Sequence, residues 1–376
     1  MNIKTLSLRN FRNFEHVEEL TFPIASLLVA AAPNATGKTN FLEGLVVLLR
    51  GKSFRAQLSE CVRWGEGEAV VRGRVETARG GVSLATSYQV ENRRLRVEEN
   101  GEVASPVEMY SQYPLVLFLP DDTFLFMRGP SARRNFLNHV LISQPHYLSA
   151  LVQYHRALKQ RNAALKGSAR WEDIEPWTQA VVQHGERVWK ERQKFSEFLA
   201  SHTERIYQEI MGEKLQLTVR FVPGAKKPDQ FREVLEATWT DERRYHYTLA
   251  GPHRDDLEVF SDGRLVQSVL SRGQIRGLTA ALKFASWHFL RQVTGEAPLL
   301  LLDEVLSELD EARQEKLLLH LPPGQVLLTC TKVPKILRDL SQVKFLDLRA
   351  IIAEGHGESP PRHETEVVKE RAEVRS

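Results

Sequence analysis

A Gly-Lys-Thr triplet near the start of the chain is the clearest sign of phosphate chemistry. Residues 32–39 read Ala-Pro-Asn-Ala-Thr-Gly-Lys-Thr and lie between the apolar run 27–31 and a segment with apolar residues at helical spacing. This order of strand, loop and helix fits a P-loop, whose backbone N–H groups surround phosphate oxygens. We therefore expect Lys38 to bind the β- and γ-phosphates of a nucleotide and Thr39 to bind Mg²⁺.

The first position of this loop departs from the P-loop pattern G-x-x-x-x-G-K-[ST], because Ala32 replaces the first glycine. An alanine with positive φ costs on the order of 1 kcal/mol. Either the backbone keeps a negative φ here, or the loop is displaced and nucleotide affinity falls. A chance Gly-Lys-Thr in an ordinary loop is the alternative, and the flanking strand and helix disfavour it. The expected nucleotide contacts in this segment are Ala32, Pro33, Asn34, Ala35, Thr36, Gly37, Lys38, Thr39 and Asn40.

Two adjacent carboxylates follow a continuously apolar run later in the chain. Residues 298–304 read Pro-Leu-Leu-Leu-Leu-Asp-Glu, which is typical of a buried parallel strand that ends in two acids. Ligands bind at this end of the strands in open parallel sheets. We expect Asp303 to bind Mg²⁺, directly or through water, and Glu304 to orient and deprotonate the attacking water. Glu304 and Lys38 are thus the candidate catalytic residues, and two solvated acids at a strand end are the alternative.

Two further motifs complete a set of four. Ser271-Arg-Gly-Gln274 stands before a segment with apolar residues at helical spacing, and alone it is more typical of a helix N-cap than of an anion site. Ser307-Glu-Leu-Asp310 follows the acidic pair. In this order the motifs resemble those of ABC-type ATPase heads. The resemblance implies that Ser271, Gly273 and Gln274 of one subunit contact the γ-phosphate bound by another, so that ATP joins two heads into a homodimer.

Among ABC-type heads, the chain most resembles the RecF family. The resemblance covers residues 1–348 in order and is most specific at Gly251-Pro-His-Arg-Asp-Asp256 and at Leu302-Asp-Glu-Val-Leu-Ser-Glu-Leu-Asp310. It implies an ATPase that uses ATP and Mg²⁺, recognises DNA at single-strand gaps and double-strand junctions, and acts with the RecR and RecO mediators to load RecA. It also implies that Arg12, in the turn Asn10-Phe-Arg-Asn13, reaches the nucleotide phosphates from beside the P-loop.

Two other classes of protein remain open at this point. A transporter-coupled ABC subunit is disfavoured by the Gly-Pro-His-Arg-Asp-Asp motif, by the long stretch between Lys38 and Ser271, and by the absence of a transmembrane segment in the sequence. A nucleotide-gated scaffold that barely hydrolyses ATP is compatible with Ala32.

The positive charge of the chain is concentrated in one segment. The whole sequence has a net charge of +3, but residues 128–170 hold eight Lys and Arg and no Asp or Glu. Such a segment could neutralise DNA phosphates, although a solvated helix face explains the charge equally well. The sequence contains no helix-turn-helix or zinc-finger pattern, so we expect recognition of DNA shape and backbone. The candidate DNA contacts are Arg128, Arg133, Arg134, Arg156, Lys159 and Arg161.

These motifs lie in patterns that predict an α/β fold. Alternating strands and helices at both ends of the chain predict a mixed or parallel sheet with an antiparallel subdomain. The resemblance implies that these elements form an ABC-type ATPase head that carries the P-loop. The helical pattern between them predicts an inserted helical lobe. We therefore divide the chain into a head (1–125 and 245–350), a mainly helical lobe (126–244) and a disordered charged tail (351–376).

Several local signals refine this interpretation. Asn100-Gly101 predicts a hairpin turn, Pro176 suits the first turn of a helix, and Gly212 suits a helix C-terminus. Cys61 and Cys330 are far apart in the sequence and stand in no ligand-like spacing. We therefore expect neither a disulfide nor a zinc site, and a location in the reducing cytoplasm. The resemblance to the RecF family implies that the protein is nucleoid-associated and has no membrane partner.

Overall fold

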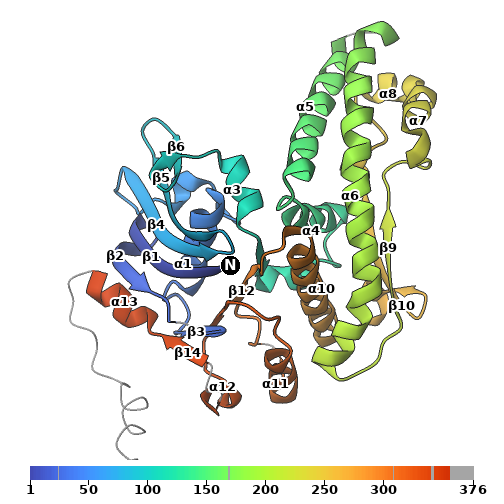
Figure 1. The fold of residues 1–376 in the computed structure, drawn as a ribbon. Coiled ribbons are helices and arrows are strands. Elements are labelled where there is room, and N and C mark those ends of the chain that lie inside the picture. The colour runs from blue at the N-terminus through green and yellow to red at the C-terminus, as the bar shows by residue number, and fades with distance from the viewer. Residues whose placement is uncertain (24, 168–169, 308, 340–342, 356–376) are drawn as a thin grey trace, which may run out of the picture. The chain divides into compact units, whose positions relative to one another are not determined.

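The computed structural model describes residues 1–355 except residues 24, 168–169, 308 and 340–342, and the chain divides into two compact units. The N-terminal unit comprises residues 2–104 and 328–333 together with the described residues from 343 onwards. The helical unit comprises Met1 and residues 105–327 and 334–339. Figure 1 labels the elements of both units.

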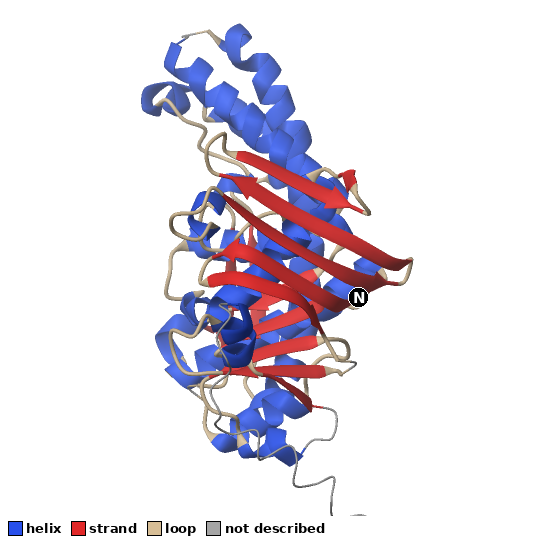
Figure 2. Ribbon diagram, turned by 90° about the vertical axis from the view of Figure 1, so that its left-hand side faces the viewer, coloured by secondary structure: helices blue, strands red, loops and turns tan. Residues whose placement is uncertain are grey.

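An antiparallel sheet dominates the N-terminal unit, and Figure 2 shows its long strands in red. In β1, the buried Leu6 and Leu8 alternate with more exposed residues, which gives the sheet one apolar face, and helix α1 (Lys38–Arg50) packs against it. Asn100 and Gly101 have φ values of 51° and 86°, which confirms the predicted hairpin turn. The strand order is β2 (Phe14–Thr21), β1 (Asn2–Phe11), β4 (Glu68–Thr77), β5 (Gly80–Gln89), β6 (Arg94–Glu99) and β7 (Glu102–Val103).

Parallel pairing supports the P-loop in the same unit. Strand β3 (Leu27–Ala31) pairs in parallel with β14 (Val343–Leu346), and the backbone N–H of Ala32 donates to the carbonyl of Cys330 at 3.1 Å, at the end of β13 (Val326–Cys330). Helix α13 (Leu348–Gly355) packs on β2. The prediction of a disordered tail is therefore wrong for residues 351–355, whereas residues 356–376 lie outside the described residues.

The helical unit contains a second parallel pair, formed by β8 (Leu115–Phe118) and β12 (Leu299–Asp303). All five residues of β12 are buried, as the apolar run predicted. Helix α10 (Arg272–Thr294) packs on β8, and the Nζ of Lys283 donates to the carbonyl of Leu117 at 2.7 Å.

The longest helices of the helical unit are α5 (Pro145–Gly167), α6 (Trp171–Met211) and α10, and the shorter α4 (Pro130–Leu141) precedes α5. Helix α6 begins at Trp171, so the prediction that Pro176 lies in a first turn is wrong. Pro176 lies inside the helix, where it cannot donate a backbone hydrogen bond to the preceding turn. Gly212 ends α6 with a left-handed φ of 71°, as predicted.

Shorter elements complete the helical unit. The three strands β9 (Leu217–Val222), β10 (Asp256–Ser261) and β11 (Arg264–Leu265) form a small antiparallel sheet. The remaining elements of the chain are α2 (Leu58–Cys61) in the N-terminal unit, and α3 (Pro106–Gln112), η1 (Pro120–Phe124), η2 (Pro228–Gln230), α7 (Phe231–Ala237), α8 (Trp239–Tyr245), η3 (Pro252–Arg254), α9 (Val266–Val269), α11 (Glu311–Leu319) and α12 (Lys335–Asp339).

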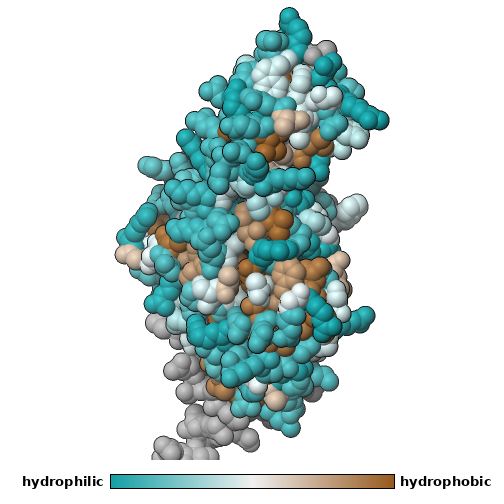
Figure 3. Space-filling model, turned by 90° about the vertical axis from the view of Figure 1, so that its right-hand side faces the viewer, coloured by the Kyte–Doolittle hydropathy of each residue, from teal (hydrophilic) through white to brown (hydrophobic). Residues whose placement is uncertain are grey.

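The architecture combines parallel and antiparallel sheets with a long helical segment, in agreement with the predicted fold class. The two units do not follow the predicted boundaries at residues 126 and 244, and that division stays a prediction. Among the described residues, no helix is both long and apolar enough to cross a membrane. The face in Figure 3 is mostly hydrophilic, and its apolar residues form patches between the polar ones.

Candidate functional site

The P-loop joins β3 to α1, and its backbone explains how alanine replaces the first glycine. Ala32 is buried and is not among the described residues with positive φ. The backbone therefore keeps a negative φ at this position, which was the first of the two predicted alternatives. The left-handed positions of the loop are instead Ala35, with φ 65°, and Gly37, with φ 106°. A left-handed alanine costs on the order of 1 kcal/mol, so the loop carries this strain at Ala35.

The start of α1 fits an anion. Gly37 is its N-cap and offers no side-chain cap, and the first turn contains no acidic residue. Its first backbone N–H groups therefore suit a phosphate oxygen. Lys38 is 5% exposed, and its Nζ donates to the carbonyls of Ala32 at 2.5 Å and Pro33 at 2.9 Å. The predicted lysine thus lies within the loop that would bind phosphates.

Two asparagines connect the P-loop to the turn between β1 and β2. The side-chain amide of Asn13 donates to the carbonyl of Thr36 at 3.1 Å, and the Asn40 amide donates to the Asn13 side-chain oxygen at 2.6 Å. A Cβ at Gly37 would lie 2.6 Å from the Asn13 side chain. Glycine is therefore required at position 37 both by its positive φ and by this close approach.

Arg12, in the same turn, is held by a buried carboxylate. Its Nε and one terminal nitrogen each donate to Glu43 of α1 at 2.8 Å, and its other terminal nitrogen donates to the carbonyl of Glu60 at 2.7 Å. The Glu43 side chain is fully buried and also accepts from Ser53 at 2.6 Å and from Arg55 at 2.8 Å. The predicted contact of Arg12 with phosphates stays a prediction, because this structure directs its guanidinium to Glu43.

Burial alone would raise the pKa of Glu43, but the hydrogen bonds from Arg12, Arg55 and Ser53 outweigh burial and lower this pKa to about 2. Arg55 also donates to the side-chain oxygen of Asn40, the residue after Thr39. Sequence reasoning missed Glu43 and Arg55. The available signal was an acid within the otherwise apolar run of α1, which in a buried helix needs a basic partner.

The acidic pair lies at the end of β12, in the helical unit. Asp303 is 2% exposed, and Glu304 has a left-handed φ of 51°. The Ser307 hydroxyl donates to the Glu304 carbonyl at 2.8 Å, which helps to hold this turn. A left-handed glutamate is uncommon, and such strain concentrates at functional sites.

Ser271 is the N-cap of α10, as its ordinary interpretation predicted. Its Oγ accepts from the backbone N–H of Gln274 at 3.3 Å, and its own N–H donates to the Gln274 side chain at 3.0 Å. This capping box leaves Ser271 exposed at the start of a 23-residue helix. Its contact with a γ-phosphate, together with Gly273, stays a prediction.

Only some of the basic side chains in the segment 128–170 are exposed. Arg161 is completely buried and donates to Thr178 at 2.9 Å, Thr248 at 2.8 Å and Glu242 at 2.6 Å. The prediction that Arg161 contacts DNA is therefore wrong, because its side chain holds α5, α6 and α8 together.

Arg133 is a second correction. It is 9% exposed and makes a two-bond ion pair with Asp256, at 2.6 and 2.8 Å. Arg134 is half-buried and donates to the carbonyl of Asp255. Arg128, Arg156 and Lys159 are exposed, so they remain the candidate DNA contacts with Arg134.

The Gly-Pro-His-Arg-Asp-Asp motif forms a loop that is held by several hydrogen bonds. Asp255 is fully buried and accepts from Arg192 at 2.6 Å, Trp189 at 2.7 Å and the backbone of Gly224 at 2.6 Å. Burial lowers the pKa of His253 to about 4, as do nearby positive charges, so this imidazole is neutral near neutral pH. The motif thus has a structural role that its sequence alone did not reveal.

Structural comparison defines the class of protein. A RecF structure described as the recombination mediator RecF–ATP of the RecFOR pathway aligns with a TM-score of 0.80 at 30% identity, over 89% of this chain and 92% of the other. The head of an Smc protein bound to ScpA aligns with a TM-score of 0.53 at 14% identity, over 94% and 96% of the two chains, and shows the fold alone. The chain is a mixed α/β head of the ABC/SMC-like ATPase class.

Sequence comparison identifies the family. The chain is 35% identical to the DNA replication and repair protein RecF of Desulforudis audaxviator strain MP104C, over 85% of this chain and 90% of that protein. It is 31% identical to RecF of Leptospira interrogans, over 96% and 100% of the two chains. The chain belongs to the RecF family of DNA replication and repair proteins. No protein-family model matches it.

Proposed function

We propose that this chain is an ATP-dependent recombination mediator that binds DNA and hydrolyses ATP slowly. The observation that carries the proposal is the start of α1, where Gly37 and Lys38 present an anion site without a competing acid. A relative with 30% identity and the same fold is described with ATP bound.

Within this proposal, the P-loop and Lys38 hold the nucleotide phosphates. Thr39 and Asp303 supply the hydroxyl and carboxylate oxygens that Mg²⁺ prefers. When bound, Mg²⁺ would neutralise charge on the phosphates. Glu304 orients and deprotonates the attacking water, and its strained backbone supports a functional role for this residue.

We further propose that ATP drives formation of a homodimer in which Ser271, Gly273 and Gln274 of one subunit contact the γ-phosphate bound by the other. The support is that Ser271 is exposed at the N-terminus of α10, where backbone N–H groups favour an anion.

DNA would be bound through its backbone by Arg128, Arg134, Arg156 and Lys159, preferentially at gaps and single/double-strand junctions. RecR and RecO would be the protein partners, with RecA loading as the outcome. These assignments are supported by family membership and by the exposure of Arg128, Arg156 and Lys159, whereas Arg134 is half-buried.

The proposal is tested by ATP binding and hydrolysis with and without gapped DNA. We expect the parent chain to bind ATP and to hydrolyse it slowly, and gapped DNA to increase the rate of hydrolysis. Lys38→Met should lose ATP binding. An intact duplex of the same length is the control for the DNA structure. Equal ATP affinity of the parent and Lys38→Met chains would overturn the assignment of the P-loop.

A further inference from the structure

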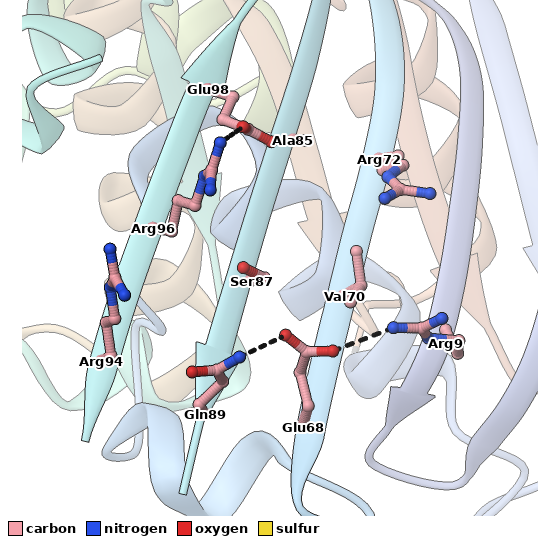
Figure 4. Close-up of a pocket in the computed structure, with 10 residues that line it drawn as sticks. All are labelled: Arg9, Glu68, Val70, Arg72, Ala85, Ser87, Gln89, Arg94, Arg96 and Glu98. Carbon is pink, nitrogen blue, oxygen red and sulfur yellow. Dashed lines mark hydrogen bonds and ion pairs between the residues drawn. The ribbon is translucent and has the colours of Figure 1, made fainter. Parts of the chain in front are cut away.

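A shallow trough lies on the outer face of the antiparallel sheet in the N-terminal unit. It has a volume of about 330 Å³ and is lined by four arginines: Arg9 of β1, Arg72 of β4, and Arg94 and Arg96 of β6. Figure 4 shows Ser87 between the arginines of β6 and those of β4 and β1. None of these residues belongs to the P-loop or to the basic segment 128–170.

Strand register explains why the arginines share one face of the sheet, on either side of a strand with small side chains. Arg72 pairs with Ala85, and Ser87 pairs with Val70 on one side and Arg96 on the other. Side chains of directly paired residues point to the same face of a sheet. The small side chains of Ala85 and Ser87 in the central strand therefore leave room between two rows of long cationic ones.

The charge of the trough is only partly compensated. Arg9 pairs with Glu68 at 2.9 Å, and Arg96 pairs with Glu98. Among the described residues, no ion pair or side-chain hydrogen bond involves the guanidinium of Arg72 or Arg94, and both residues are exposed. The trough thus offers two free guanidinium groups, whose planar shape suits phosphate oxygens.

We propose that this trough binds the phosphate backbone of duplex DNA, in addition to the cations of the helical unit. The inference rests on the proposed DNA-binding function and extends it to a surface that the charge of the sequence did not indicate. Arg94 and Arg96 are two residues apart, roughly 6.6 Å along the strand, which is about two nucleotide steps of rise along the axis of a DNA helix. Repeated arginines on neighbouring strands of one sheet face fit a repeating phosphate backbone.

The trough also contains two acids, Glu68 and Glu98. Removing arginines should lower the affinity for DNA, whereas neutralising these acids should raise it. Arg72→Ala with Arg94→Ala should weaken duplex binding about 10-fold to 100-fold at low salt and flatten the slope of log affinity against log salt by roughly 1.8. Glu68→Gln with Glu98→Gln frees Arg9 and Arg96, so affinity should rise and the slope should steepen. Each variant is titrated with a labelled duplex over a range of salt concentrations, and its melting temperature is measured.

A matched control removes two exposed cations of the same unit that do not line the trough. Arg79→Ala with Lys344→Ala changes the net charge equally and should leave the salt slope close to that of the parent. If the parent binds DNA and the Arg72/Arg94 variant has the same slope of log affinity against log salt, the trough is not a DNA-binding surface, and the proposed function is unaffected. A parent chain that binds no DNA would instead overturn the proposed function on which the trough rests.

Discussion

Arg12 and Glu43 are joined by two hydrogen bonds of 2.8 Å, and this pair connects the turn after β1 to the helix that follows the P-loop. Because Glu43 also holds Arg55, one buried carboxylate faces two guanidinium groups, and the cluster keeps a net charge of +1. Through Arg55, this charge lies next to Asn40, at the start of α1. The cluster can therefore support phosphate binding even while Arg12 remains bound to Glu43.

The Glu43 cluster predicts a loss of stability in acid. The pKa of Glu43 is lowered to about 2 in the folded chain, so the unfolded chain binds the proton more readily. Stability from this group is complete above the unfolded pKa and is lost as pH falls towards the folded pKa, by on the order of 3 kcal/mol. Urea unfolding at neutral and at acidic pH should show this loss, and Glu43→Gln should unfold more easily at neutral pH but depend less on pH. Equal pH dependence of the two chains would contradict the assignment.

Glu304→Gln tests the proposed base. ATP binding should remain, hydrolysis should slow on the order of 10²-fold to 10⁴-fold, and the ATP-bound dimer should accumulate, because only water activation is lost. Single-turnover hydrolysis and size-exclusion chromatography with ATP measure the two effects. Hydrolysis at the parent rate would remove Glu304 from the role of base.

The basic segment predicts two different phenotypes. Arg156→Ala with Lys159→Ala should weaken DNA binding similarly for all sequences and flatten the salt slope, at an unchanged melting temperature, because both residues are exposed. Arg161→Ala should instead destabilise the chain by about 3–5 kcal/mol, because it leaves Glu242 buried without its cation. Thermal unfolding and salt-dependent DNA titration separate the two. A stable Arg161→Ala chain with weaker DNA binding would reverse our correction.

The shared site predicts complementation between two inactive variants. Ser271→Arg should bind ATP as a monomer but fail to dimerise, although loss of the cap costs about 1 kcal/mol of stability. Lys38→Met should fail to bind ATP. A mixture should regain part of the activity, below half of the parent level, because one site can combine an intact Lys38 with an intact Ser271.

Two controls complete this experiment. Cross-linking must show the mixed dimer, and activity should rise with total protein concentration. A mixed dimer without activity would contradict a single working composite site, and activity of the Ser271→Arg monomer would exclude the shared site.

The sequence predicted best where the signal is local. The apolar run before Asp303 became the buried strand β12, and the Ser271 motif became an N-cap, because strand burial and capping depend on neighbouring residues. Gly212 and Asn100-Gly101 were predictable for the same reason.

Long-range partners explain what was missed. The cluster at Glu43 gathers residues from the turn at Arg12 and the segment 53–55, which no local pattern connects. Arg161 was wrongly predicted to contact DNA because the charge count of the segment did not consider which face of the helix each residue occupies. It follows Leu151 and Tyr154 on the buried face of α5, and that helical spacing was visible in the sequence.

The left-handed backbone of Glu304 also has a consequence for protein engineering. Glycine at this position would relieve about 1 kcal/mol of backbone strain, and asparagine would relieve part of it. Selection for heat resistance alone would thus favour loss of the carboxylate that we propose as the base. A thermostable version of this chain should therefore be sought by substitutions elsewhere, since at residue 304 backbone stability and catalysis demand different amino acids.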